Sequence, residues 1–221
     1  MKRRESNVAK IKTYKINEVF FSIQGEGSFT GMPMVFVRFS GCNLSCSFCD
    51  TKHQRHSRMT GEEIEQAILH TLSHLPTPVG VRVCFTGGEP TLQLDDELIL
   101  RLCGKFNLHL ETNGTRTPPC LGVFEAITVS PKKRLIEMNW IPGNTLLHST
   151  EGNKDLKIVW DTQDHMLMQM VRDWEGFGWR RRYIQPCWRK GKANYQEAVE
   201  FVQSHPEWSL SVQMQRILCV R

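Results

Sequence analysis

The sequence of 221 residues has no apolar run of the length that crosses a membrane, no internal repeat and no low-complexity tract. Its basic start continues with Glu5-Ser6-Asn7, where a secretory signal would carry an apolar core. These absences argue against a membrane span and against a cleaved signal. We therefore expect a cytoplasmic protein, in a compartment where thiols stay reduced.

The sequence also has little charge imbalance and no long run of one charge. Its net charge is +5, and its basic residues occur in short groups such as Lys132-Lys133-Arg134 and Arg180-Arg181-Arg182. Short groups of this kind are most simply a solvated face, so we expect no direct binding of nucleic acid. We expect residues 1–15 to be a flexible leader. The length predicts a single domain over residues 16–221.

A fourth cysteine is missing where three others gather. Cys42, Cys46 and Cys49 follow one another in a CxxxCxxC spacing, whereas the other cysteines are scattered and are expected as core or incidental thiols. A structural zinc ion takes four ligands, so a zinc knuckle would need His53 as well. An iron–sulfur cluster held by three cysteines keeps one iron open for another ligand. The spacing favours the cluster.

Apolar strands alternate with helical segments along the chain. We expect strands at residues 34–39, 81–85, 108–110, 126–129, 156–160, 182–184 and 210–213, and helices at residues 60–75, 95–104, 163–174 and 194–204. This alternation predicts parallel βα units and therefore an α/β fold. Polar residues stand just after these strands, namely Glu89, Glu111, Ser130, Lys132 and Gln185. In barrel-like α/β folds the active site lies at that edge, so we expect one site there.

Two motifs together resemble the radical S-adenosylmethionine (SAM) superfamily: the CxxxCxxC loop after one strand and Gly-Gly-Glu-Pro at residues 87–90 after the next. Further motifs resemble the 7-carboxy-7-deazaguanine synthase family within it: Gln24-Gly25-Glu26-Gly27, Arg38, residues 49–53, residues 111–115 and residues 129–132. The resemblance extends from about residue 16 to the end. It implies a partial, (β/α)6-type TIM-like barrel of the radical SAM fold, usually as a homodimer.

The resemblance also implies an activity. Members of the family convert 6-carboxy-5,6,7,8-tetrahydropterin into 7-carboxy-7-deazaguanine with loss of ammonia, in the biosynthesis of queuosine and other 7-deazapurines. The implied cofactors are a [4Fe–4S] cluster, SAM and Mg²⁺, and the implied electron donor is of the flavodoxin type. Cleavage of SAM would give a 5′-deoxyadenosyl radical, which takes a hydrogen atom from the pterin.

The same resemblance implies a set of site residues. The cluster would be held by Cys42, Cys46 and Cys49, and the Mg²⁺ by Thr51. SAM would be bound by Phe48, Gly87, Gly88, Glu89, Glu111, Asn113, Ser130 and Lys132. The pterin would be bound by Ile23, Gln24, Gly25, Glu26, Gly27, Arg38, Thr86 and Gln215. Whether Lys132 meets SAM or the pterin is left open.

The chemistry of several of these residues suits the implied roles. Gln24 and Glu26 offer the donors and acceptors that the amide-like edge of a pterin needs. Arg38 can bind a substrate carboxylate through two parallel hydrogen bonds. The two glycines before Glu89 permit close approach, so that a backbone carbonyl or the Glu89 side chain can accept a hydrogen bond from the SAM ammonium.

Two features depart from the family pattern. The family commonly has Gln-Thr-His-Lys where this chain has Gln213-Met214-Gln215-Arg216, so an amide stands in place of an imidazole. Residues 140–154 match nothing in the family and are expected as a lid or a surface loop. Two other functions compete, a glycyl-radical-enzyme activase and a non-enzymatic zinc or iron–sulfur module. Residues 24–27, Arg38 and residues 50–53 favour the pterin enzyme over the activase, and a non-enzymatic module would not explain Gly-Gly-Glu-Pro or the polar residues at the strand ends.

Overall fold

The computed structural model describes residues 11–51, 55–76, 80–132, 146–149, 153–189 and 191–221. The strands of its main sheet are β1 (Tyr14–Ile23), β2 (Pro33–Phe39), β3 (Ser57–Met59), β4 (Arg82–Gly87), β5 (Asn107–Thr112), β6 (Phe124–Val129), β7 (Lys154–Trp160), β8 (Arg181–Pro186) and β11 (Ser209–Leu210). The helices are α1 (Gly61–Thr71), α2 (Asp96–Cys103), α3 (Leu167–Glu175), α4 (Tyr195–Ser204) and α5 (Met214–Ile217). A small hairpin pairs β9 (Trp188–Arg189) with β10 (Lys192–Ala193).

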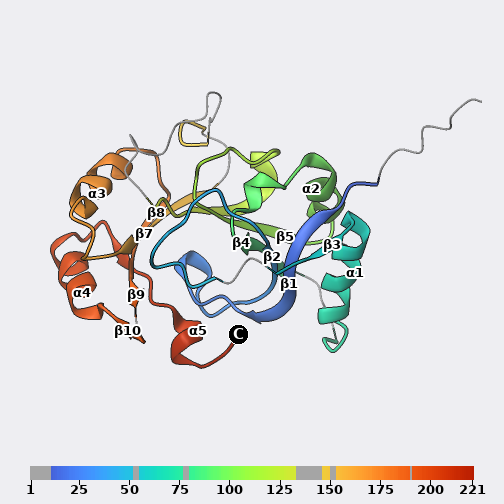
Figure 1. The fold of residues 1–221 in the computed structure, drawn as a ribbon, viewed down its shortest axis with the longest axis horizontal. Helices are drawn as coiled ribbons and strands as arrows, with labels where there is room; N and C mark the ends of the chain where they lie inside the picture. Colours follow the sequence, from blue (N-terminus) through green and yellow to red (C-terminus); the bar gives the residue numbers. More distant parts are fainter. Residues whose placement is uncertain (1–10, 52–54, 77–79, 133–145, 150–152, 190) are drawn as a thin grey trace, which may run out of the picture.

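The main sheet has the strand order β11-β8-β7-β6-β5-β4-β2-β1-β3. From β2 to β11 the neighbouring strands are parallel, while β1 runs antiparallel to both β2 and β3. Helices α1 to α4 lie around the outside of this curved sheet (Figure 1). Within the described residues β3 and β11 do not pair, so the sheet is an open, partial barrel. The predicted α/β class is confirmed.

The strands of the sheet bury both of their faces. In β2 the side chains of Val35, Val37 and Phe39 are fully buried in the large core that the sheet shares with its helices. The alternate side chains of Met34 and Phe36 belong to a second, smaller cluster. Such two-sided burial is typical of parallel strands. It leaves the carboxyl ends of the strands as the place where polar side chains gather.

Helix α1 begins where the sequence predicts. Thr60 Oγ1 accepts from Glu63 N at 3.2 Å, and Thr60 N donates to the Glu63 carboxylate at 2.7 Å, which together form a capping box. The helix ends at Thr71, before the expected residue 75. The reason lies in the next turn, where Leu72 N donates to Leu69 O at 3.1 Å, a bond that spans three residues instead of four.

Both ends of the described chain differ from the expectation. β1 begins at Tyr14, whose ring is buried and whose hydroxyl donates to Asp95 at 2.7 Å, so the sheet takes in two residues assigned to the leader. The strand expected at residues 210–213 is wrong beyond Leu210, because Met214 N donates to Gly25 O at 3.1 Å and draws the chain across the loop after β1. Most of the segment 140–154 lies outside the described residues, as do residues 1–10. Among the helices described, none is both long and apolar enough to span a bilayer.

Candidate active site

A cavity of about 1210 Å³ opens at the carboxyl ends of the parallel strands. The predicted residues that line it are Ile23, Gln24, Gly25, Glu26, Arg38, Cys42, Cys46, Phe48, Cys49, Thr51, Thr86, Gly87, Gly88, Glu111, Asn113, Ser130, Lys132 and Gln215. Gly27 and Glu89 are not part of the lining. The lining residues after β2, β4, β5 and β6 meet because these parallel strands end together. Residues 23–26 reach the cavity from the end of the antiparallel strand β1, whose last residue pairs with Pro33 at the start of β2.

The three clustered cysteines lie in the loop that follows β2. Cys42 and Cys46 are half-buried and Cys49 is exposed, and none of the three forms a disulfide within the described residues. Cys49 N donates to Cys46 O at 3.1 Å, and Leu44 N donates to Cys42 Sγ at 3.4 Å, so local hydrogen bonds shape the loop. His53, the candidate fourth ligand of a zinc knuckle, lies outside the described residues. Three thiols from one loop on the wall of a large cavity fit a cluster that also binds a small molecule.

Gly87 and Gly88 hold the cysteine loop against the end of β4. Gly88 N donates to Phe39 O at 3.0 Å, and Glu89 N donates to Gly41 O at 2.9 Å. Gly87 has a φ of +122°, and a Cβ added at Gly88 would lie 2.0 Å from Gly41 O. A side chain at either position would be strained or would clash. The glycines therefore allow two backbone segments of the protein to approach, which the sequence had suggested only for a ligand.

The carboxylate of Glu89 is fully buried beneath the cavity wall. Its Oε1 accepts from Thr91 N at 3.0 Å, Thr91 Oγ1 at 2.6 Å and Thr112 Oγ1 at 2.7 Å, while Oε2 accepts from Asn113 N at 2.7 Å. Burial raises the pKa of Glu89, and these hydrogen bonds oppose that rise. The side chain is therefore engaged within the protein. Of the two acceptors expected for the SAM ammonium, a backbone carbonyl is the one that fits.

Asn113 joins the end of β5 to the cysteine loop. Its Nδ2 donates to Asn43 Oδ1 at 3.0 Å and lies 4.0 Å from Cys42 Sγ. Its Oδ1 accepts from Thr115 N at 2.9 Å, and Thr115 Oγ1 in turn accepts from Asn43 Nδ2 at 2.9 Å. These bonds hold the cysteine loop at a fixed place beside the strand ends. Asn113 thereby takes part in the site as a support for the loop.

Lys132 follows β6 and lines the cavity. Its Nζ donates to Ser130 Oγ at 2.6 Å. Burial lowers the pKa of Lys132, and the charges of Lys157, Cys46 and Glu26 also act on it. The ammonium is thus near enough to the cysteine loop and to the carboxylates opposite to meet a ligand on either side.

A buried lysine lies between two of the predicted carboxylates. Lys157 Nζ, on β7, forms ion pairs with Glu26 and with Glu111, the second at 2.9 Å. Gln24 Nε2 donates to the other oxygen of Glu111 at 3.0 Å. Burial raises the pKa of Glu26, but Lys157 and two glutamine amides lower it by more, so the net pKa is about 2. Both carboxylates therefore offer acceptor oxygens in the cavity wall, each paired with the same ammonium. Glu111 lies with the residues predicted for the pterin, although the resemblance implies a contact with SAM.

The C-terminal segment closes this wall with two amides. Gln213 Nε2 and Gln215 Nε2 each donate to Glu26 Oε1 at 3.0 Å. Gln215 packs so closely on Gly25 that a Cβ there would lie 1.6 Å from its Oε1. That Oε1 is buried and has no hydrogen-bond partner among the described residues. Gln215, which replaces the common histidine, thus turns its oxygen to Gly25 and its amide N–H to Glu26.

Arg38 lies at the end of β2 and lines the cavity. Its Nε donates to Glu18 Oε1 at 2.8 Å, and its guanidinium lies 5.5 Å from the centre of the Phe20 ring. Glu18 also pairs with Arg221 at the end of the chain. The guanidinium is therefore held in place from one side. This arrangement fits the predicted role of Arg38 as a binder of a carboxylate.

Thr51 lies directly after the cysteine loop, with its side chain half-buried in the cavity wall. Its Oγ1 donates to Asp50 Oδ1 at 3.4 Å, while Asp50 Oδ2 accepts from Gln213 at 3.2 Å and from Arg216 at 2.5 Å. A hydroxyl and a carboxylate are oxygen donors, which Mg²⁺ prefers. The donor set at this point therefore fits the predicted ion.

Several cavity residues were missed by sequence reasoning, above all Lys157 and Gln213. The signal for Lys157 was present, because every residue of β7 is buried and a charged residue in such a strand requires a partner. Two cysteines that were treated as incidental, Cys187 and Cys219, also line the cavity. Nothing in the spacing of those two distinguishes them from core thiols.

The fold and the cysteine loop together define a radical SAM protein. The family model that matches the chain is described as "Radical SAM superfamily" and covers residues 36–129, from β2 through β6. It includes the cysteine loop, Gly-Gly-Glu-Pro and the end of β5. A solved structure titled "Crystal structure of QueE from Escherichia coli" is similar in fold, with a TM-score of 0.65 and 25% identity over 91% of this chain and 94% of that chain.

Curated relatives narrow the class further. A 7-carboxy-7-deazaguanine synthase from Bacteroides thetaiotaomicron is 40% identical over 94% of this chain and 98% of the relative. One from Caulobacter vibrioides is 37% identical over 93% of this chain and 98% of the relative. The chain belongs to the 7-carboxy-7-deazaguanine synthase family of radical SAM enzymes. The family membership that the sequence motifs predict is thereby confirmed.

Proposed function

We propose that this protein converts 6-carboxy-5,6,7,8-tetrahydropterin into 7-carboxy-7-deazaguanine with loss of ammonia, as a step towards queuosine and other 7-deazapurines. The observation that carries the proposal is one cavity that joins a three-cysteine loop to a wall of carboxylate and amide side chains. The loop suits radical generation, and the wall suits recognition of a flat ring rich in hydrogen-bonding groups. Membership of the family supports the same reaction.

The cysteine loop would hold the [4Fe–4S] cluster through Cys42, Cys46 and Cys49. The cluster and SAM supply the radical that removes a hydrogen atom from the pterin. SAM would lie along the ends of β4, β5 and β6, where the backbone of Gly87-Gly88 and the side chain of Ser130 line the cavity. Phe48 adds an aromatic ring to this part of the wall. The protein's own part is to hold both ligands in contact and to exclude water.

The pterin would bind against Glu26, Glu111 and Gln24. The carboxylate oxygens would accept hydrogen bonds from the amino and ring N–H groups of the substrate. Gln215 would support this wall through its hydrogen bond to Glu26. Arg38 supplies a positive charge for the substrate carboxylate, and Thr51 supplies an oxygen ligand for Mg²⁺. Each group thus has a complement on the proposed substrate.

We further propose that the protein is a cytoplasmic homodimer with residues 16–221 as a single domain, which receives its electron from a flavodoxin-type protein. Its net charge of +5 supports an acidic donor. An activase would use the cavity to admit a peptide of its partner. The polar wall around Glu26 favours a small hydrogen-bonding substrate instead.

The test is an anaerobic assay of cluster-loaded protein with SAM, a chemical reductant and the carboxytetrahydropterin. We expect about four iron and four sulfide per chain and formation of 7-carboxy-7-deazaguanine. Protein that cleaves SAM and leaves the pterin unchanged would contradict the proposed substrate. Stoichiometric zinc without iron after anaerobic reconstitution would contradict the radical SAM chemistry as well.

A further inference from the structure

Lys157 occupies a position in the cavity wall for which the proposed reaction has assigned no role. Its side chain is 4% exposed, yet it lines the cavity from the middle of β7. It pairs with Glu26 from the loop after β1 and with Glu111 from the end of β5. One ammonium therefore joins three separate elements at the proposed pterin site.

We propose that Lys157 is the positioning residue of the pterin site, where its ammonium holds the carboxylates of Glu26 and Glu111 in place and aimed as hydrogen-bond acceptors. This inference rests on the proposed function and deepens it. Lys157 acts through the two carboxylates and need not touch the substrate itself. Its role is thus to fix the charge and the geometry of the groups that do.

The charges around the pair support this role. Two carboxylates share a buried space, and without a cation their mutual repulsion and their burial would both favour protonation. Burial lowers the pKa of Lys157, but the two carboxylates more than reverse that shift, so the net pKa is raised and the ammonium persists. Other charged or titratable groups face this space from neighbouring elements, namely Arg38, Lys132, His109 and Asp155. Of these described groups, Lys157 is the one that forms ion pairs with both carboxylates.

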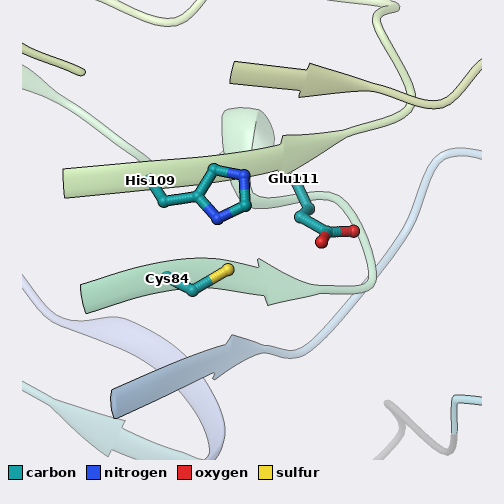
Figure 2. A group of neighbouring side chains, drawn as sticks. All are labelled: Cys84, His109 and Glu111. Atoms are coloured by element: carbon teal, nitrogen blue, oxygen red, sulfur yellow. The ribbon is translucent and has the colours of Figure 1, made fainter. Parts of the chain in front are cut away.

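An alternative use of this region is a metal site. Cys84, His109 and Glu111 lie on neighbouring strands β4 and β5, with their ligand atoms within 4.8 Å of one another (Figure 2). Glu111, however, already pairs with Lys157 through one oxygen and accepts from Gln24 through the other. The ammonium would repel a divalent cation at the same carboxylate. The geometry therefore favours the ion-paired arrangement.

The two remaining members of that group, Cys84 and His109, carry no charge that competes for the ammonium of Lys157. Burial lowers the pKa of His109 to about 4, so its ring is neutral at neutral pH. Burial raises the pKa of the Cys84 thiol well above its usual range, so it is neutral too. Figure 2 shows the imidazole turned towards the sulfur of Cys84. Because these two neighbouring side chains are buried and uncharged, the interaction between Lys157 and its two partners is stronger.

The first test removes the charge of Lys157 and keeps a side chain of similar length. In Lys157→Met holoenzyme we expect the KM for the carboxytetrahydropterin to rise about 10- to 100-fold, the range expected when charged hydrogen bonds are lost. Cluster content and reductive SAM cleavage without pterin should stay within about twofold of the unsubstituted enzyme, because Lys157 contacts neither part. An unchanged KM would overturn the proposal.

Lys154→Met is the matched control. Lys154 is also buried on β7, but its ammonium donates to the carbonyls of Leu146, Leu147 and Ser149 and, among the described residues, pairs with no carboxylate. It is expected to lose stability without a change in the KM for the pterin. Failure of the unsubstituted enzyme to turn over the pterin would count against the proposed function itself, which separates the two outcomes.

The second test needs no activity and uses thermal unfolding of the cluster-free chain between about pH 4 and pH 8. With Lys157, the pKa of Glu26 is depressed, so its contribution to stability is present above the unfolded-state pKa and is lost as the pH falls towards 2. In Lys157→Met the Glu26 carboxylate loses its cation while burial still raises its pKa, so that this pKa should rise above the unfolded value. That variant should therefore lose stability as the pH rises through about 4.5 and beyond.

The expected result is a difference in Tm between Lys157→Met and the unsubstituted chain that is large at pH 8 and narrows towards pH 4. The difference for Lys154→Met should stay constant over that range. A constant difference for Lys157→Met would overturn the proposal. If Lys157→Met does not fold, adding Glu26→Gln should restore folding by removing a stranded charge, and continued failure to fold would count against the proposal.

Discussion

Thr51 is the residue whose proposed role is easiest to separate from the rest of the site. Its hydroxyl lies beside Asp50, while its bond to the cysteine loop, from Cys49 Sγ at 3.7 Å, goes to the backbone carbonyl that alanine keeps. Thr51→Ala should therefore weaken the Mg²⁺ dependence of turnover and leave iron content unchanged. Thr51→Ser, which keeps the hydroxyl, is the control. Equal Mg²⁺ responses in the alanine variant and the unsubstituted enzyme would remove Thr51 as a ligand.

Gly88 allows a second test at the scale of one residue. A Cβ there would lie 2.0 Å from Gly41 O and would push the cysteine loop away from β4. We expect Gly88→Ala to cost about 1–3 kcal/mol of stability and to lower the iron content after reconstitution. Gly104→Ala is the control, because a Cβ at Gly104 would meet no atom within 4 Å. Full iron content in Gly88→Ala would show that the loop tolerates the shift.

Single residues also show where sequence reasoning reached its limit. The cysteine triplet and the paired glycines are local patterns, and the structure places all of them at the cavity. Many partners of a side chain are not local: Glu89 turns to Thr112 and Asn113, and Lys157 reaches back 131 residues to Glu26. The parallel pairing of strands decides those contacts, and no short spacing records it.

Among the elements, the C-terminal segment with α5 has the most direct link to the site. Arg216 donates to Asp50 and Gln213, and its guanidinium lies 4.9 Å from the centre of the Trp188 ring. Because Arg216 and Asp50 are partly exposed, Arg216→Ala should cost no more than about 1 kcal/mol of stability. It should nevertheless raise the KM for the pterin, because Gln213 and Gln215 lose their support.

The control for that variant is Arg172→Ala on α3, where the arginine bonds to Gln169 on the same helix. Kinetic constants for pterin and SAM should be unchanged in Arg172→Ala. If Arg216→Ala also leaves both constants unchanged, α5 has no part in substrate binding. Urea unfolding of both variants would show whether their small stability losses match.

Elements were predicted best where one pattern decided them. The capping box at Thr60 and the apolar run of β2 gave nearly correct boundaries. The segment after Leu210 was wrong because its backbone bonds to Gly25 instead of continuing the sheet. An apolar–polar alternation cannot distinguish a strand from a segment that is extended for another reason.

At the scale of the whole molecule, the net charge of +5 bears on the proposed electron donor. If that donor is an acidic flavodoxin-type protein, turnover should fall several-fold when ionic strength rises from about 0.05 to about 0.3 M, because screening slows their encounter. Turnover driven by a small chemical reductant is the control and should change little. Equal salt responses with both reductants would argue against electrostatic docking.

The bonds from Gly88 and Glu89 to the cysteine loop also bear on the order in which the protein matures. Residues 42–49 are synthesised before β4, yet the backbone that supports them is completed only by β4 and by Asn113 at the end of β5. A nascent chain that has emerged only as far as the cysteines would present three thiols without their support. We therefore expect cluster insertion to follow synthesis of β5, and a carrier that delivers iron and sulfide to act on a largely folded chain.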